Sequence, residues 1–442
     1  MNAPGLREPG IPAENDEPLP RVIGPLGFGA ITLNGVIGAG IFALPAVAAA
    51  RVGNFSPWLF LLCAVLIFTI VLAFARAASF ERQTGGPIAY ATHAFGPFVG
   101  FQTGWVYYLS RLAAMAANTN LLVTYAAWYW PALDDGIVRQ AAISVIVLGL
   151  TAINYVGVRA SLVTVYVLTA MKLLPLLLLI LMGLGSLRLE LLTEVDLPRL
   201  EGLGETVLVL LYAFIGFENS VIQAGEARNP RRDIPRALVQ TVLLIAVIYF
   251  LLQWVSMSVL PGLADTERPL ADAAVVVMGT AGALLLSLGA VFSIGGNCSA
   301  SIMSAPRMTY AMARDGSLPA WFARVHPKHR TPGNSVLFYG AASLALAVSG
   351  TFIFFAVIST VARLLMYVVS ILSLPRLKQK IGEQPGQFRL PGGMLIPVIA
   401  LALCAWLLAQ ADALAWAATL GLVLVGAGLY ALARRSHKEV LA

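Results

Sequence analysis

The sequence predicts an all-α membrane protein, and three features support this fold class: the composition, the long apolar runs and their even hydropathy. Of 442 residues, 59% are hydrophobic and only 12% are charged, whereas a soluble domain carries about 25% charged residues. Runs such as LFLLCAVLIFTIVLAF and VLTAMKLLPLLLLILMGL lie in segments near the roughly 20 residues that cross a bilayer. Because a backbone in lipid must satisfy its own hydrogen bonds, and barrel strands alternate in hydropathy, these runs indicate helices.

We expect twelve transmembrane helices, because apolar segments of sufficient length recur twelve times along the chain. The predicted domains are a cytoplasmic tail over residues 1–24, a transmembrane domain over residues 25–433 and a second cytoplasmic tail over residues 434–442. The first tail lacks the basic start and apolar core of a cleaved signal peptide. The helices are expected to begin near Leu26, Trp58, Phe98, Gln140, Leu162, Thr206, Ala237, Ala273, Ser335, Phe352, Leu395 and Leu414.

The distribution of Lys and Arg predicts that both termini are cytoplasmic. With the N-terminus inside, most of the 29 basic residues fall in inner segments, and the outer segments hold only Arg51, Arg139, Arg188, Arg199 and Arg268. The net charge of +7 then follows from topology and anionic lipid, so we expect a multi-pass protein of the plasma membrane (the bacterial inner membrane) and no nucleic-acid partner. The longest inner segment, residues 304–335, is amphipathic, and we expect it to lie along the membrane surface.

Catalytic and metal-binding patterns are missing from the sequence. The three cysteines are isolated in apolar segments, the four histidines fall in polar ones, and none has the spacing of a metal or redox site. The sequence contains no phosphate-binding GxxxxGK[ST] loop, no HExxH pair and no serine-nucleophile elbow. We therefore expect neither an enzyme nor a cofactor, but a bundle of helices around a binding site.

Ionisable residues inside apolar segments are candidates for function, since a charge is costly at membrane depth. Lys172 lies roughly 15 Å from either surface, so its ammonium must meet water, a carboxylate or backbone carbonyls inside the bundle. It is either a fixed structural cation or a titrating group. Glu218 follows a mid-membrane glycine and is either protonated, paired or gating. Arg111 and Arg363 also lie inside apolar segments, with structural and functional roles both open.

Two glycine-containing stretches occupy corresponding places in two halves of the chain. NGVIGAGIF, with Gly35, Gly38 and Gly40, lies in the first apolar segment, and YAFIGFEN, with Gly216, lies in the sixth. Glycine weakens helices, and interrupted helices at matching positions indicate an inverted-repeat transporter. An interrupted helix offers N–H donors to a carboxylate and C=O acceptors to an ammonium. The alternative is close helix packing through small residues, with Gly35 and Ala39 as the pair.

On four ordered motifs, the chain resembles the amino acid–polyamine–organocation superfamily, which has the leucine-transporter-type fold. The motifs are LNGVIGAGIFALP, QTGGPIAYATHAFGPFVGFQTGWVYYLS, YAFIGFENSVIQAGEARNPRRDIPRA and SAPRMTYAMARDGSLPAWFARVHPKHRTP. The resemblance covers nearly the whole chain and implies a 5+5 inverted repeat with discontinuous helices 1 and 6. Repeat one is expected over about 25–186, repeat two over about 205–377 and two further helices over about 392–433. A central site is implied between spans one, three, six, eight and ten.

The resemblance also implies that substrate binds at the two interrupted helices. Amides around Gly38, Ala39 and Gly40 are expected to hold a substrate carboxylate. The substrate ammonium is expected at the carbonyls of Ile37, Ala213, Phe214 and Phe217. Lys172 matches the lysine that some sodium-independent relatives place where sodium-coupled ones hold an ion. The full set of expected substrate-binding residues is Ile37, Gly38, Ala39, Gly40, Ile41, Tyr212, Ala213, Phe214, Ile215, Phe217 and Asn297.

The activity that the resemblance implies is sodium-independent secondary transport of amino acids by alternating access. Relatives with this lysine include proton-coupled carriers and exchangers, so both coupling modes stay open, and Lys172, Glu218 and Tyr107 are the expected gating or coupling residues. Asn297 and Tyr212 stand where a similar arginine/agmatine antiporter uses a bulky aromatic and a tryptophan, which favours a small or neutral amino acid. The alternatives are a polyamine, cationic-amine or arginine-type carrier, in which Glu218 neutralises a cation, and a transporter-like sensor. Expected partners are the amino acid, a proton or counter-substrate and membrane lipid, with the chain a monomer or homodimer.

Overall fold

The computed structural model covers residues 1–442 and describes all of them except residues 1–22, 81–84, 157–161, 196, 384 and 442. The described residues form α-helices and short 3-10 turns, with one isolated β-bridge between Ile23 and Ala227 and no named strand. The predicted all-α fold class is therefore confirmed for the described part of the chain. Apart from Ile23 and Gly24, the predicted N-terminal tail lies outside it.

The helices begin within about two turns of the predicted starts, because the apolar runs that define them are long. Two short helices, α4 (Pro87–Phe95) and α8 (Glu190–Thr193), lie in segments for which no helix was expected. The helices built from long apolar runs are α3 (Ser56–Phe80), α5 (Pro97–Ala126), α6 (Gly136–Val156), α7 (Leu162–Gly183), α11 (Pro230–Val259), α12 (Pro269–Arg314, with a kink at Gly279), α13 (Gly333–Ser349), α14 (Phe352–Ile381), α15 (Leu395–Leu408) and α16 (Ala413–Leu441).

Seven of the described helical segments are long and apolar enough to cross a membrane. Three shorter apolar helical segments, Leu203–Ala213, Gly333–Ser349 and Leu395–Leu408, accompany them. The seven are Gly40–Phe80, Gly136–Val156, Thr164–Ser186, Pro230–Val259, Pro269–Arg314, Phe352–Ile381 and Ala413–Arg435.

Both glycine-containing stretches interrupt a helix, as predicted. The first separates α1 (Pro25–Val36) from α2 (Gly40–Val52), and residues 37–39 between them are not helical. The second follows α9 (Leu203–Leu210) and a single 3-10 turn and ends where α10 (Glu218–Ile222) begins. At the second interruption Gly216 has a φ of 115°, a backbone conformation that glycine adopts far more readily than residues with a Cβ.

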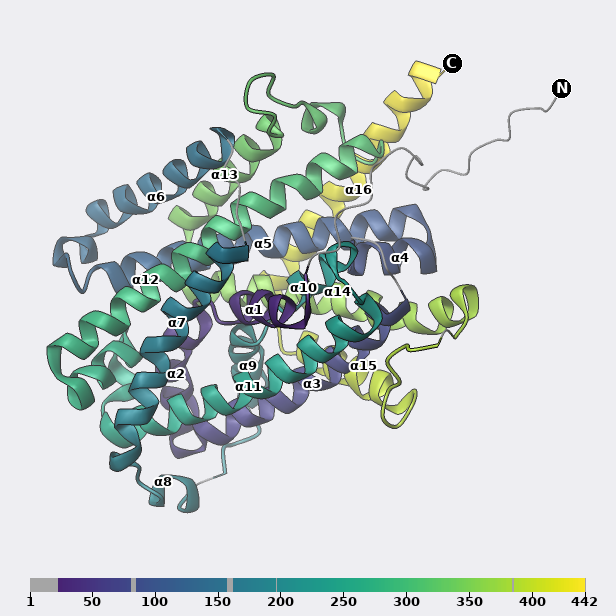
Figure 1. The fold of residues 1–442 in the computed structure, drawn as a ribbon. Helices are drawn as coiled ribbons and strands as arrows, with labels where there is room; N and C mark the ends of the chain where they lie inside the picture. The colour runs from purple at the N-terminus through teal and green to yellow at the C-terminus, as the bar shows by residue number, and fades with distance from the viewer. Residues whose placement is uncertain (1–22, 81–84, 157–161, 196, 384, 442) are drawn as a thin grey trace.

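The interrupted helices lie at the centre of the bundle. In Figure 1, α1 and α10 occupy the middle of the molecule, with α6, α13 and α16 at its periphery. Around this centre α11 packs along α3, α14 packs along α5, and α12 packs against α5 and α7. Backbone groups released by the two interruptions are thus enclosed by helices rather than exposed to lipid, which is the condition for irregular backbone at membrane depth.

Part of the segment expected along the membrane surface continues a bundle helix. Residues 304–314, expected to lie in a loop along the membrane surface, continue α12 as a helix that ends at Arg314. Ala305, Thr309, Met312 and Ala313 are buried at the spacing of one helix face, so this stretch packs into the bundle instead. The non-helical part of the segment therefore begins only after Arg314.

Candidate functional site

The two interruptions touch each other through glycine. A Cβ placed on Gly35 would lie 2.5 Å from the carbonyl oxygen of Gly216, and one placed on Gly216 would collide with the carbonyl of Gly35. A Cβ on Gly40 would lie 2.6 Å from the Cα of Ala213. All three obstructing atoms belong to the backbone, so they cannot move aside as the end of a flexible side chain would. The glycines therefore allow the two interrupted helices to cross in direct backbone contact.

The first interruption leaves N–H donors free at the start of α2. The Gly38 N–H donates to the Val36 carbonyl at 2.8 Å. The N–H groups of Ala39, Gly40 and Ile41 have no acceptor among the described residues. These donors carry the positive end of the dipole of the 13-residue helix α2. The start of α2 can therefore accept a negatively charged group.

Carbonyls of the second interruption are partly occupied by the protein itself. The Ala213 carbonyl accepts a hydrogen bond from the Tyr249 hydroxyl at 3.1 Å, and the Phe217 carbonyl accepts one from the Ser220 hydroxyl at 2.8 Å. The carbonyls of Phe214 and Ile215 accept no hydrogen bond from any described residue. The carbonyls of Ala213, Phe214 and Phe217 were expected to bind a substrate ammonium. Among these three, the Phe214 carbonyl is the one that accepts no hydrogen bond from a described residue.

Lys172 binds the first interruption. Its Nζ donates to the Ile37 carbonyl at 2.8 Å, to Oδ1 of Asn34 at 2.5 Å and to the Asn34 carbonyl at 3.3 Å. The Ile37 carbonyl also accepts from the Ser293 hydroxyl at 3.3 Å. An ammonium has three N–H donors, and Lys172 meets three acceptors while fully buried. The lysine on α7 therefore holds the carbonyl end of α1, and the Ile37 carbonyl is taken by protein donors.

Glu218, the first residue of α10, forms a buried ion pair with Arg363 on α14. The Arg363 Nε lies 2.7 Å from Oε1 of Glu218, and both side chains are at least nine-tenths buried. Oε2 of Glu218 accepts from the Tyr367 hydroxyl at 3.1 Å and from the Gly216 N–H at 3.0 Å. Of the roles considered for Glu218, pairing is thus the one that the geometry favours. Both carboxylate oxygens are engaged, and they fix the second interruption to α14.

Tyr107 on α5 lies between two guanidinium groups. The Cζ atoms of Arg111 and Arg363 are 5.8 Å and 5.9 Å from the centre of its ring, within the distance of a cation–π contact. The Tyr107 hydroxyl donates to Oδ1 of Asn219 at 2.9 Å and accepts from Arg111 at 3.3 Å. Tyr107 therefore connects α5 to α10 and to both buried arginines.

A small cavity lies where these elements meet. Its volume is about 30 Å³, far below the roughly 300–1,000 Å³ of a typical ligand pocket. The predicted residues Gly38, Ala39, Gly40, Tyr212, Ile215 and Asn297 line it. The predicted residues Ile37, Ile41, Ala213, Phe214 and Phe217 are buried but do not line it. The lining residues that sequence reasoning did not assign to the site are Gly35, Val36, Arg111, Ala114, Asn118, Gly216, Asn219, Ser301 and Arg363.

Two of the predicted residues line this cavity from different elements. The Tyr212 hydroxyl donates to Oδ1 of Asn118 at 2.8 Å, and its ring packs edge-on against Phe352 at 5.6 Å between ring centres. The Nδ2 atom of Asn297 lies 2.9 Å from the position that a Cβ on Gly38 would take. Asn297 on α12 thus sits directly over the first interruption. Asn118 was not predicted as a site residue. The signal that could have found it is its polar side chain inside an apolar segment.

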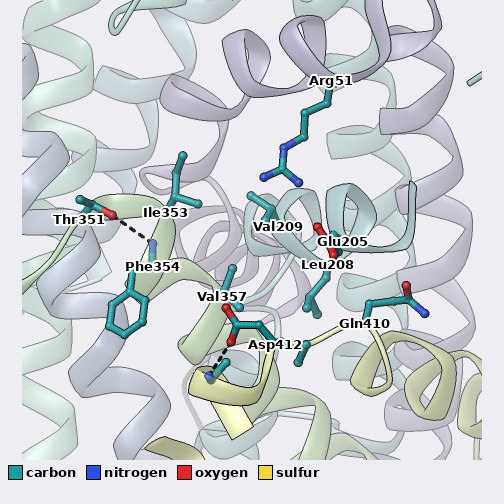
Figure 2. A pocket seen from close by; sticks show the side chains of 12 residues that line it. Arg51, Glu205, Leu208, Val209, Thr351, Ile353, Phe354, Val357, Gln410 and Asp412 are labelled. Carbon is teal, nitrogen blue, oxygen red and sulfur yellow. Dashed lines mark hydrogen bonds between the residues drawn. The ribbon is translucent and has the colours of Figure 1, made fainter. Parts of the chain in front are cut away.

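A second and larger cavity lies apart from the interruptions. It has a volume of about 450 Å³ and lies between the end of α2, helix α9, the start of α14 and the turn before α16 (Figure 2). Arg51, Glu205, Gln410 and Asp412 are among its lining residues, and the Asp412 carboxylate accepts from the Ala415 N–H at 2.6 Å. None of the predicted site residues lines it. The smaller cavity is the better candidate, because free backbone donors and buried charges converge there.

The chain is similar in sequence to known transporters and to one protein family. A family model described as "Amino acid permease" matches residues 27–421. An uncharacterized transporter of Mycobacterium tuberculosis is 30% identical over 78% of this chain and 77% of its own length. The methylthioribose transporter of Bacillus subtilis is 26% identical over 91% of each chain. The serine/threonine exchanger SteT of Bacillus subtilis is 26% identical over 88% of this chain and 90% of its own.

The match to the family covers both interruptions, the buried ion pair and the cavity between them. The apolar helices and the family together identify a multi-pass membrane protein. Its relatives named above are transporters, and the prediction that the chain is not an enzyme is confirmed. The chain belongs to the amino acid permease family.

Proposed function

We propose that this protein is a secondary active transporter that carries an amino acid across the plasma membrane by alternating access. The observation that carries the proposal is the crossing of two interrupted helices in backbone contact at Gly35 and Gly216. Free N–H donors at the start of α2 face a cavity at this crossing. In transporters built from repeats, substrates bind at such interruptions near the middle of the membrane.

The proposed topology has twelve spans in a 5+5 inverted repeat, with both termini in the cytoplasm. The order of the helices supports it, because an interrupted helix opens each set. The first set is α1–α2, α3, α5, α6 and α7, and the second is α9–α10, α11, α12, α13 and α14. The remaining helices α15 and α16 follow both sets. A monomer or a homodimer is compatible with this arrangement.

In the proposed complex, the substrate carboxylate accepts hydrogen bonds from the free N–H groups of Ala39 and Gly40. The helix dipole of α2 adds to this attraction. The ammonium binds the carbonyls of Phe214 and Ile215, which are free, rather than those of Ile37 and Ala213, which already accept hydrogen bonds from the protein. This pose keeps the expected carboxylate site. Of the expected ammonium acceptors it keeps the Phe214 carbonyl, and it adds the Ile215 carbonyl.

Transport is proposed to be independent of sodium. The Lys172 ammonium is bound to the carbonyl groups at the end of α1, where a cation would otherwise be coordinated. A second cation beside it would meet electrostatic repulsion in a medium of low dielectric constant. Coupling is then to a proton, with Lys172 as the titrating group, or to a counter-substrate. The similarity to a serine/threonine exchanger favours a counter-substrate.

Alternating access requires the helices around the cavity to separate. A cavity of about 30 Å³ is far smaller than the roughly 300–1,000 Å³ of a typical ligand pocket, so an amino acid enters only when the cavity expands. The small volume and the side chains of Asn297 and Tyr212 support a small substrate. A polyamine or other cation is less well supported, because Arg111 and Arg363 line the cavity, no acidic residue does, and the nearby Glu218 is paired.

Two measurements test the proposed function. A thermal-shift screen of the purified protein against amino acids, amines and methylthioribose identifies the class of ligand that stabilises it. Uptake of the best ligand into proteoliposomes is then compared in sodium and choline buffers. We expect an amino acid to stabilise the protein and uptake to be equal in the two buffers. Stabilisation by amines alone, or a large loss of uptake in choline, contradicts the proposal.

A further inference from the structure

Arg111 is a buried cation with only neutral hydrogen-bond partners. Its side chain lies on α5, lines the central cavity and is 7% exposed. Nη1 donates to Oδ1 of Asn219 at 2.8 Å and to the Tyr107 hydroxyl at 3.3 Å, and Nη2 donates to the Ser304 hydroxyl at 2.8 Å. Its Nε is buried and has no acceptor in the described part of the chain.

Glu218 precedes Asn219, the hydrogen-bond partner of Arg111, but it does not compensate the charge of Arg111. Glu218 gives one oxygen to Arg363 and the other to Tyr367 and to the Gly216 N–H. Among the described residues, Arg111 forms no ion pair. Burying an unpaired guanidinium is strongly unfavourable, so a buried charge of this kind is normally paired with an acid or with a bound anion.

The charge around the cavity is therefore positive when the cavity is empty. Arg363 and Glu218 cancel, whereas Arg111 remains, and the start of α2, which also lines the cavity, adds the positive end of its dipole. A zwitterionic amino acid brings no net charge and leaves this excess in place. An amino acid with an acidic side chain brings one net negative charge and removes it.

We propose that Arg111 binds a second carboxylate of the substrate, so that the protein carries acidic amino acids such as aspartate or glutamate. The α-carboxylate then binds the N–H groups at the start of α2, and the side-chain carboxylate accepts from the free Nε of Arg111. This inference rests on the proposed function and specifies its substrate class. It replaces the neutral side chain expected from Asn297 and Tyr212, since those residues restrict the size of a side chain and not its charge.

Two other roles for Arg111 make different predictions. As a purely structural residue it would tie α5 to α10 and α12 through Asn219 and Ser304, and its removal would affect all ligands equally. As a site for a separate inorganic anion, it would make the binding of neutral amino acids dependent on chloride. Only a second substrate carboxylate makes the acid bind more tightly than its amide.

Pairs of an acidic amino acid and its amide, which have nearly the same shape, test the proposal. Binding of aspartate, asparagine, glutamate and glutamine to the purified protein is measured by calorimetry at pH 7, in chloride and in gluconate. Because a hydrogen bond between two charged groups is stronger than one to a neutral amide, we expect each acid to bind about tenfold more tightly than its amide, or better. The preference should be the same with either anion.

Variants assign the preference to Arg111. We expect Arg111→Gln to reduce the ratio of acid affinity to amide affinity to about one, because the amide side chain carries no charge. Arg111→Lys should retain part of the preference, since it keeps the charge without Nε. Arg139→Gln is the matched control: this arginine at the start of α6 donates to Asn120 and Thr124 and does not line the cavity. The Arg139→Gln variant should keep the wild-type ratio of acid affinity to amide affinity.

Each outcome decides between the alternatives. Equal affinity for acid and amide in the wild type, a preference that survives in Arg111→Gln, or chloride-dependent binding of asparagine overturns the inference. If Arg111→Gln does not fold, an Arg111→Lys protein with an unchanged ratio overturns it as well. Binding of neutral amino acids without the acids leaves the proposed function intact, whereas binding of no amino acid contradicts both.

Discussion

Arg363 donates from Nε to Oε1 of Glu218 at 2.7 Å, and this buried ion pair joins α14 to the first residue of α10. Arg363 also bonds to Ser359 one turn earlier, and Tyr367 bonds to the same glutamate one turn later. Three residues on one face of α14 thus hold the second interruption in place. The pair fixes the geometry of the candidate site without contributing a free charge to it.

Glu218→Gln should destabilise the protein strongly, because it leaves the Arg363 guanidinium buried without its carboxylate. Loss of one partner of a buried ion pair costs about 3–5 kcal/mol. The double variant Glu218→Gln with Arg363→Gln should lose less than the sum of the two single variants. Thermal unfolding of the purified variants in detergent provides the measurement, and additive losses would show that the two residues act independently.

Gly35→Ala should destabilise the protein and reduce transport, because the new Cβ would lie 2.5 Å from the Gly216 carbonyl oxygen. Overpacking of this kind costs about 1–3 kcal/mol. Gly149→Ala on α6 is the control, since a Cβ there meets no atom within 4 Å. Thermal unfolding and uptake are compared for both variants. Equal behaviour of the two would contradict the close contact of the interruptions.

Lys172→Met should abolish substrate accumulation driven by a pH gradient, because among the described residues Lys172 is the titratable group bound to the carbonyls of the first interruption. Uptake into proteoliposomes is measured with and without an inward proton gradient. Lys378→Met, at an exposed position near the end of α14, is the control and should behave as the wild type. Should Lys172→Met still concentrate substrate as the wild type does, the lysine is a fixed structural cation.

Asn297→Trp should select against larger substrates. Nδ2 of Asn297 lies 2.9 Å from the Cβ position of Gly38, so an indole there would fill the cavity over the first interruption. We expect the affinity for larger amino acids to fall about tenfold more than that for the smallest ligands. Competition assays over a series of side-chain sizes measure this ratio. A uniform loss across the series would indicate misfolding instead.

The α-carboxylate of the substrate should be obligatory. The N–H groups of Ala39, Gly40 and Ile41 have no acceptor in the described structure, and their positive dipole favours an anion. Each amino acid that binds is therefore compared with its methyl ester and its decarboxylated amine. We expect only the free acid to compete, since unpaired buried donors cost about 1–3 kcal/mol each. Equal competition by the amines would support a polyamine carrier.

Local sequence pattern was sufficient for the helices and for both interruptions. Apolar runs of membrane-spanning length placed the helix starts, and glycine placed the two non-helical stretches. Local pattern did not reveal that residues 304–314, expected as part of an amphipathic surface segment, continue α12. Those residues continue α12 because alanine and methionine at helical spacing pack one face into the bundle. Burial against other helices overrode the local polarity.

The sequence by itself determined a helical membrane protein with two glycine-weakened helices and a few ionisable residues at depth. Only the tertiary structure decided the partners of those residues. Glu218 and Arg363 are 145 positions apart, and Lys172 is 135 positions from the Ile37 carbonyl that it binds. A buried charge must find a partner, but local pattern does not specify which one, because long-range packing brings the candidates together. Among the described residues packing also left Arg111 without an acid, and this unpaired charge supports the proposed second carboxylate site.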